Sequence, residues 1–103
     1  MAQYDIYPNP GLKQVAIPFL VAVQNDHVSS RTGACLAMPL RANAQPVETM
    51  ASLVDVPGRG VFVLSADEIF TIDVACLKHA VGALSLSDRA KIGPAIDKVI
   101  GDY

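Results

Sequence analysis

The side chains that could perform acid–base chemistry are few and lie far apart in the sequence. His27 and His79 are the first candidates, because imidazole titrates near neutral pH. His27 lies in a polar, turn-rich segment where we expect it to be solvated. His79 follows Lys78 in a segment that we expect to be a half-exposed strand. We therefore interpret both histidines as surface residues rather than catalytic ones.

The two cysteines, Cys35 and Cys76, each stand alone inside an apolar run. This environment predicts two buried, unbridged thiols in a reducing cytoplasm. A disulfide would require an oxidising compartment. A reactive thiolate is the alternative for Cys76, because basic Lys78 and His79 lie close by in the sequence.

The remaining polar groups do not form a recognisable catalytic or metal site. No two His, Cys, Asp or Glu residues have the spacing of metal ligands. Asp55, Asp67 and Glu68 are typical of turn and surface carboxylates, and Gly58-Arg59-Gly60 is typical of a hairpin tip rather than a phosphate loop. We predict no metal, no cofactor and no enzyme activity, and interpret the chain as a protein-binding module.

Composition narrows the possible partners. The 103 residues are enough for one domain, 1–103. Apolar residues make up 51% and charged residues only 17%, so we expect apolar surface that a second copy of the chain would cover. The net charge is −2 and the basic residues are scattered, which argues against direct contact with nucleic acid. No apolar run approaches the ~20 residues that span a bilayer, and no signal peptide is recognisable, so we expect a cytoplasmic protein without membrane contact.

The first half of the chain predicts a central strand. Within Val15–Gln24, apolar residues alternate onto both faces, which is typical of a strand covered on both sides, with pairing starting after Pro18. Asn25–Gly33 is polar and is predicted to form a hairpin loop. Ala34–Leu40 is predicted to form the return strand, ended by Pro39. Arg41–Met50 has weak signals and is expected to be a loop with a short helical turn.

The second half predicts a hairpin and two further strands. Leu53–Val56 and Val61–Leu64 flank the turn-forming residues 57–60. Ile69–Ala75 alternates, with Phe70, Ile72 and Val74 expected to point inward. Leu77–Leu84 is expected to form another strand, bent at Gly82. A short first strand is expected over Gln3–Tyr7.

The C-terminus changes to a helical period. An apolar stripe recurs at helical spacing, with Asp88, Lys91, Ala95, Lys98 and Asp102 expected on the opposite face. Ser85 and Asp88 resemble a capping box. Pro94 predicts either a kink or a restart with Gly93 as N-cap. The stripe consists of Ile92, Ile96, Val99, Ile100 and Tyr103. Short strands with one terminal helix predict a mainly β fold, a small antiparallel barrel with the helix packed against it.

The order of these segments resembles the CcdB family of toxins from type II toxin–antitoxin modules. The resemblance is carried by Tyr4–Tyr7, by Pro18–Asp26 with its Val-Gln-Asn-Asp corner, by Ala37–Leu40, and by Leu84-Ser85 opening a helix that contains Ala95-Ile96-Asp97. It extends over almost the whole chain. No single motif is specific, but their order, their spacing and the total length together are.

The resemblance implies a homodimer of SH3-like barrels, each with a C-terminal helix. Family members poison DNA gyrase by inserting into its A subunit, and a disordered antitoxin segment neutralises them. The helix ends of both protomers form the gyrase contact. We therefore expect the dimer interface at Ile92, Ile96, Val99 and Ile100, and cognate antitoxin and gyrase as partners.

The tail departs from the family pattern. The gyrase contact of the family is a terminal Trp-Gly-Ile, whereas this sequence has no Trp. Aligning the glycines places Ile100 where the family has Trp, and Asp102-Tyr103 where it has the final Ile. We expect the partner-binding residues at Ile100, Gly101, Asp102 and Tyr103. Two alternatives stay open: a toxin of this fold with an altered or lost target, and an endoribonuclease toxin of the MazF type.

Overall fold

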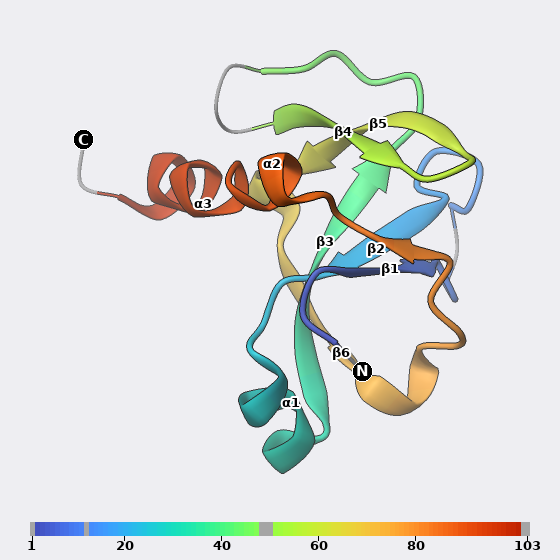
Figure 1. Cartoon of the computed structure of the whole chain (residues 1–103), viewed down its shortest axis with the longest axis vertical. Helices are drawn as coiled ribbons and strands as arrows, with labels where there is room; N and C mark the ends of the chain where they lie inside the picture. The colour runs from blue at the N-terminus through green and yellow to red at the C-terminus, as the bar shows by residue number, and fades with distance from the viewer. Residues whose placement is uncertain (1, 12, 48–50, 102–103) are drawn as a thin grey trace.

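A computed structural model describes residues 2–11, 13–47 and 51–101. The chain forms an antiparallel sheet that curls into a half-barrel, with two helices of its C-terminal segment packed against it (Figure 1). This confirms the predicted mainly β barrel with a C-terminal helix. The strands are β1 (Asp5–Pro8), β2 (Phe19–Ala22), β3 (Ala34–Arg41), β4 (Ala51–Val56), β5 (Gly60–Ser65), β6 (Phe70–Asp73) and β7 (Gly82–Ala83).

The strands follow the order β4-β5-β3-β2-β1-β7, and β6 also pairs with β3. Strand β3 therefore pairs with two successive strands along one side. Its residues 34–37 pair with β6, and its residues 40–41 pair with β5. Pro39 lies between these two stretches, so its missing N–H removes no bond from either ladder. For this reason β3 continues through Pro39 to Arg41, whereas the sequence predicted an end at the proline.

Apolar side chains fill both faces of the central strands. The larger cluster gathers Phe19, Val21 and Val23 with side chains of the other strands and of the C-terminal helix. A smaller cluster on the other face contains Tyr7, Ala22 and Cys35. All four residues of β2 are buried, which confirms the predicted central strand covered on both sides.

The predicted hairpin loop at Asn25–Gly33 is wrong, because the segment forms helix α1 (Asp26–Thr32). The side chain of Asn25 accepts a hydrogen bond from the His27 backbone N–H, which caps the helix start. Gly33 ends the helix with a left-handed φ of 73°. The helix is mostly exposed and lacks an apolar stripe, so its polar sequence resembles that of a loop.

The β4–β5 hairpin lies where the sequence predicts it, around the turn at 57–60. Gly58 and Gly60 both have positive φ, which explains the glycines of this turn. The helical turn expected in Arg41–Met50 is not found among residues 42–47, which form bends and a bridge from Val47 to Ala51. Residues 48–50 lie outside the described part of the chain.

The segment after β5 differs from the predicted pair of strands. Residues 66–68 form the 3-10 turn η1 (Ala66–Glu68), and β6 is followed by a second 3-10 turn, η2 (Val74–Cys76). Ile72 and Val74 pack on the smaller cluster as predicted, whereas Phe70 is exposed. Of the expected strand Leu77–Leu84, only β7 forms.

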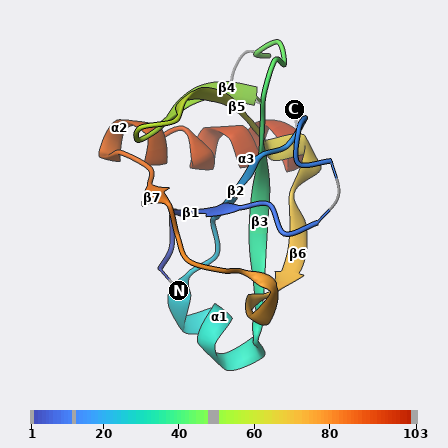
Figure 2. The ribbon, with the colours of Figure 1, turned by 90° about the vertical axis from the view of Figure 1, so that its right-hand side faces the viewer.

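Two helices close the chain, α2 (Leu86–Arg89) and α3 (Ile92–Ile100). They lie at the opposite end of the molecule from α1 (Figures 1 and 2). The helical chain is interrupted before Ile92, and Pro94 falls in the first turn of α3, where its missing N–H costs no helical bond. The structure therefore has a restart, with Lys91 rather than Gly93 as the N-cap.

Candidate protein-binding site on the C-terminal arm

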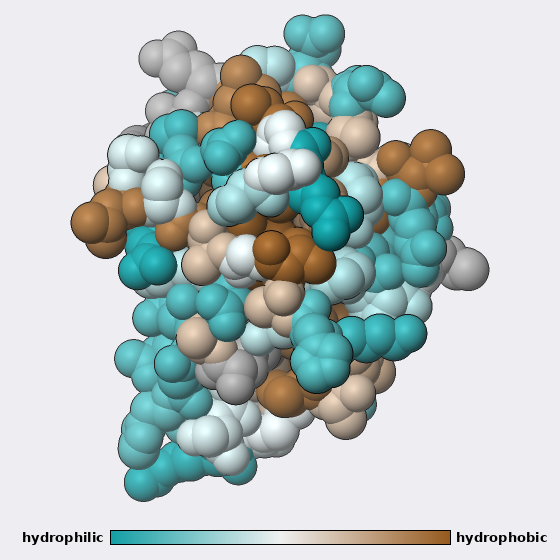
Figure 3. Space-filling view, turned by 45° about the vertical axis from the view of Figure 1, so that its right-hand side comes forward, coloured by the Kyte–Doolittle hydropathy of each residue, from teal (hydrophilic) through white to brown (hydrophobic). Residues whose placement is uncertain are grey.

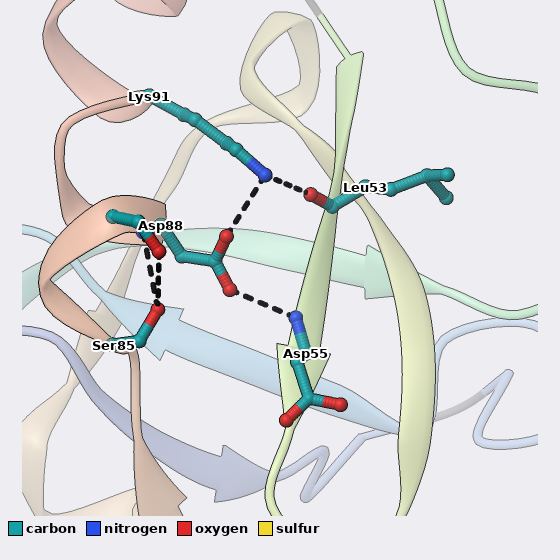
Figure 4. Close-up of polar contacts among 6 residues, drawn as sticks. Leu53, Asp55, Ser85, Asp88 and Lys91 are labelled. Carbon is teal, nitrogen blue, oxygen red and sulfur yellow. Dashed lines mark hydrogen bonds and ion pairs between the residues drawn. The ribbon is translucent and has the colours of Figure 1, made fainter.

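Residues 85–101, which we call the C-terminal arm, are fastened to the edge of β4 by a set of polar contacts (Figure 4). The Ser85 hydroxyl accepts a hydrogen bond from the Asp88 N–H at 3.2 Å, which caps α2 as predicted. The Asp88 carboxylate does not complete the capping box. Its Oδ2 instead accepts the backbone N–H of Asp55, at 2.9 Å.

Lys91 completes this polar junction, which we define as Ser85, Asp88 and Lys91 with the β4 backbone at Leu53 and Asp55. Its Nζ lies 2.8 Å from Asp88 Oδ1 and donates to the Leu53 carbonyl at 2.7 Å. Burial alone would raise the pKa of Asp88, but hydrogen bonds from Lys91 and from the Asp55 N–H outweigh it, so the pKa lies below its ordinary value. Asp88 is 6% exposed, so its expected position on the outer helix face is wrong.

Arg89 adds a second attachment of the arm to the sheet. Its Nε donates to the Leu84 carbonyl at 3.0 Å, and its guanidinium lies 5.1 Å from the centre of the Tyr4 ring. Tyr4 itself packs against the larger apolar cluster. The arm is thus held at α2 by directional polar contacts on two sides.

The two ends of α3 differ in burial. Ile92 is 5% exposed and packs in the larger cluster together with Ala95, which is fully buried. The expected outward position of Ala95 is therefore wrong, because the buried face of the helix is centred on residues 92 and 95. Ile96 and Val99 are half-buried against the cluster, and Ile100 is 74% exposed. The apolar stripe thus emerges from the core toward the helix end.

An apolar groove of about 250 Å³ lies beside the last turns of α3. Three elements supply its walls: β3, the turn η1 with the residue after it, and α3. The described residues that line it are all apolar. The groove is lined by Leu36, Ala66, Ile69, Ile96, Val99 and Ile100.

An ion pair holds the turn η1 that forms one wall of this groove. The Arg41 guanidinium donates from Nε and Nη2 to the two carboxylate oxygens of Glu68. This contact keeps the pKa of Glu68 below its ordinary value and raises that of Arg41. Because Arg41 belongs to β3 and Glu68 to η1, the pair fixes the groove wall to the sheet.

Apolar groups also reach the surface away from this groove. Leu86 on α2 is 80% exposed, and Val15 and Val61 are exposed on other elements. On the face drawn in Figure 3, apolar groups stand in separate spots between hydrophilic ones. The surplus of apolar surface expected from composition is therefore present but dispersed, and the groove is where apolar side chains from several elements converge.

The structure brings only some of the sequence-predicted site residues together. Ile96, Val99 and Ile100 line the groove, whereas Ile92 is used inside the protomer's own core. Gly101 leaves helical geometry, with φ −69° and ψ 163°, while its N–H still bonds to the Asp97 carbonyl. Asp102 and Tyr103 lie outside the described residues.

The candidates for acid–base chemistry stay apart in the fold. His27 is exposed on α1, and His79 is exposed in an irregular segment rather than in the expected strand. Cys35 is buried as predicted, but Cys76 is exposed in η2, which corrects the expectation of two buried thiols. Within the described ranges, no group of three His, Cys, Asp or Glu side chains is placed to hold a metal ion. None of the described helices is long and apolar enough to cross a membrane.

Sequence reasoning missed the groove residues that lie outside the helix. Leu36 and Ile69 belong to segments that were used only to assign strands. Ile69 packs on the larger cluster because η1 turns the chain just before it. Sequence reasoning also missed the role of Asp88 and Lys91 at the β4 edge. Their spacing of three residues on a helix was the one available signal.

The sequence matches the model of the CcdB family, described as CcdB protein, over residues 3–101. The chain belongs to the CcdB family. The match covers nearly the whole chain and confirms the resemblance drawn from Tyr4–Tyr7, Pro18–Asp26 and the helix start. A comparison with curated proteins finds no match.

Solved structures with the same fold support the assignment of this CcdB-family chain. An endoribonuclease in complex with its cognate antitoxin, from a mycobacterial species, is 18% identical with a TM-score of 0.83, covering 98% of this chain and 95% of that one. A second mycobacterial endoribonuclease is 15% identical with a TM-score of 0.77, covering 98% and 91%. At this identity the likeness establishes the fold. With the family match, the protein is a toxin of a toxin–antitoxin module.

Proposed function

We propose that this toxin binds and poisons DNA gyrase through the end of its C-terminal helix, without enzyme activity of its own. The observation that carries the proposal is the exposed end of α3 in a chain of the CcdB family, with Ile100 at 74% exposure beside the apolar groove. Exposed apolar side chains that project from a fixed element are typical of protein contacts. Such a toxin would act in the cytoplasm, where gyrase is found.

We further propose that the active form is a homodimer that buries the apolar groove. Ile96 and Val99 of one protomer would pack on the same groove of the other, as a two-fold interface requires. Apolar area removed from water contributes about 25 cal/mol per Å². Covering this groove and Ile100 would therefore stabilise the dimer, and it would place the two tails side by side at one end of the assembly.

The tail would make the target contact with a different set of side chains from the family pattern. Ile100 stands in place of the family's Trp and is the exposed anchor. Gly101 leaves helical geometry, and the residues after it would meet the partner. Asp102 adds a negative charge to the contact and Tyr103 an aromatic ring. The cognate antitoxin would neutralise the toxin by covering this surface.

A second candidate is an endoribonuclease toxin. The observation that favours it is the fold shared with two mycobacterial endoribonucleases, one of them in complex with its cognate antitoxin. RNA cleavage requires basic and acid–base side chains converging on one site. In this chain His27 and His79 are both exposed but lie on separate segments, which favours the gyrase proposal. A toxin of this fold with a different protein target is the third candidate.

One experiment separates the three candidates. The purified protein is titrated into a gyrase supercoiling assay and, in parallel, into a metal-free RNA cleavage assay on a long unstructured transcript. Loss of supercoiling with intact RNA is the expected result. Cleaved RNA with normal supercoiling would replace the proposal with the endoribonuclease. Growth arrest on induced expression, with neither effect in vitro, would indicate another protein target.

A further inference from the structure

Strand β4 is an edge of the sheet, and four of its outward backbone groups are engaged by other parts of the chain. The N–H and C=O of Ala51 pair with Val47 at 2.8 and 2.9 Å. Further along, Lys91 Nζ contacts the Leu53 carbonyl and Asp88 Oδ2 accepts the Asp55 N–H. The side chains of the C-terminal arm thus continue the hydrogen bonding that a neighbouring strand would supply.

We infer that Asp88 and Lys91 are positioning residues, which fix the angle of α3 by fastening the start of the helix to the β4 backbone. This inference rests on the proposed function, in which the far end of α3 meets the target. Neither residue is among the described residues that line the groove. They act through the helix that carries Ile100.

The geometry of the arm explains why these two residues matter. Lys91 immediately precedes α3, which has nine residues. At 1.5 Å per residue the helix is about 13 Å long, so a swing of ~10° at its start moves Ile100 by roughly 2 Å. An error of that size is enough to misplace an anchor side chain in a partner's pocket.

The apolar contacts of α3 do not set this angle by themselves. Ile92 and Ala95 hold the helix against the core, and Ile96 and Val99 pack half-buried against it, but hydrophobic contact is non-directional. The hydrogen bonds of the polar junction are directional, and both end on backbone groups that cannot rotate away. Asp88 is buried and paired with Lys91, so it stays charged and in place.

Asp55 provides a matched control for this inference. Its backbone N–H belongs to the polar junction, but its own carboxylate points away from Asp88 and Lys91 (Figure 4). Replacing Asp55 by alanine therefore removes a carboxylate from the same place in the fold while leaving the junction intact. Ile72→Ala, a change on β6, serves as a second control that lowers stability in the smaller cluster, away from the larger cluster that holds α3.

The test compares Asp88→Ala and Lys91→Ala with Asp55→Ala and Ile72→Ala in the full chain. Residual dipolar couplings of the α3 amides measure the helix angle relative to the sheet, and hydrogen exchange measures protection of the Asp55 amide. We expect changed α3 couplings in both junction variants and at least tenfold faster exchange at Asp55 in Asp88→Ala. Both controls should keep the wild-type couplings. Asp88→Asn, which keeps one acceptor for the Asp55 N–H, replaces Asp88→Ala if that variant does not fold.

Activity is measured on the same variants. We expect the gyrase-inhibiting dose to rise at least tenfold in the junction variants, and to stay within twofold of wild type in both controls. Unchanged α3 couplings in Asp88→Ala and Lys91→Ala would overturn the inference. If wild-type protein leaves gyrase unaffected, the proposed function fails, while the couplings still decide whether the junction sets the helix angle.

Discussion

The first and last turns of α3 belong to one helix but serve different purposes. At the first turn, Ile92 is 5% exposed and the polar junction holds the chain to β4. At the last turn, Ile100 is 74% exposed and Gly101 takes the chain out of the helix. The helix is thus buried at its start and exposed at its end. One apolar stripe therefore supplies both core packing and the exposed end for which we propose a role in recognition.

The largest effect that distinguishes the two turns is expected for Ile92→Ala. Removing a buried isoleucine leaves a cavity in the larger cluster, and such changes cost about 2–5 kcal/mol. Chemical denaturation followed by circular dichroism measures the loss in the free energy of unfolding. A change below about 1 kcal/mol would show that the first turn does not carry the packing assigned to it.

The next effect is expected at the middle of the helix, where Ile96→Asp introduces a charge into the apolar groove. If the groove is the dimer interface, an unpaired charge there should give monomer or aggregate. Sedimentation or light scattering at micromolar concentration measures the mass. Asp97→Asn, an exposed position one residue along, should leave the mass of the dimer unchanged. A wild-type protein that is monomeric across this concentration range would contradict the proposed homodimer.

The polar junction should make stability depend on acid pH. The pKa of Asp88 in the folded protein lies below its ordinary value of 3.8, which an unfolded chain would show. The stabilisation from ionised Asp88 is therefore complete above that value, and it is lost as pH falls through the folded pKa. We expect the unfolding free energy of wild type to fall more steeply than that of Asp88→Asn as the pH falls below about 4.

Glu68 must be taken into account in the same experiment. The pKa of Glu68 is also lowered, by Arg41, so the Asp88→Asn variant keeps the part of the acid dependence that Glu68 contributes. The variant Glu68→Gln separates the two contributions. Identical pH profiles for wild type and Asp88→Asn would contradict the assigned charge of Asp88.

The smallest effect on stability is expected for Ile100→Ala. An exposed side chain contributes little to folding, so the unfolding free energy should change by no more than about 0.5 kcal/mol. Binding to the target should nevertheless weaken at least tenfold if Ile100 is the exposed anchor, as we propose. Chemical denaturation measures the unfolding free energy, and a gyrase binding assay measures the affinity for the target. Unchanged binding would show that the last turn of α3 does not make the target contact.

Much of the sheet could be predicted from the sequence, because its strands carry strong local signals. Strand β2 was recognisable because apolar residues alternate onto both of its faces. The β4–β5 hairpin was recognisable from the turn-forming residues between the strands. Helix α1 could not be recognised in this way, since an exposed seven-residue helix has no apolar stripe. Its Asn25 cap and Gly33 end were the available signals, and both also occur in loops.

The sequence predicted the C-terminal helix, but it did not predict which of the apolar residues are buried and which are exposed. Periodicity identifies the apolar side of a helix and cannot tell which apolar residues face the protein's own core and which face a partner. Ile92 and Ile100 are equivalent in the pattern and differ in the structure. Likewise, Asp88 and Lys91 read as solvated charges, because their partners are backbone atoms of a strand more than thirty residues away.

The most direct test of the account removes the residues after the helix. Full-length protein and a variant lacking Gly101–Tyr103 are expressed under an inducible promoter in bacteria without the antitoxin, and both are checked for folding by circular dichroism. The account predicts that the full-length toxin arrests growth and inhibits gyrase supercoiling. The truncated protein, folded and with unchanged oligomeric state, should do neither. Equal growth arrest by the two proteins would contradict the claim that the end of the C-terminal arm carries the function.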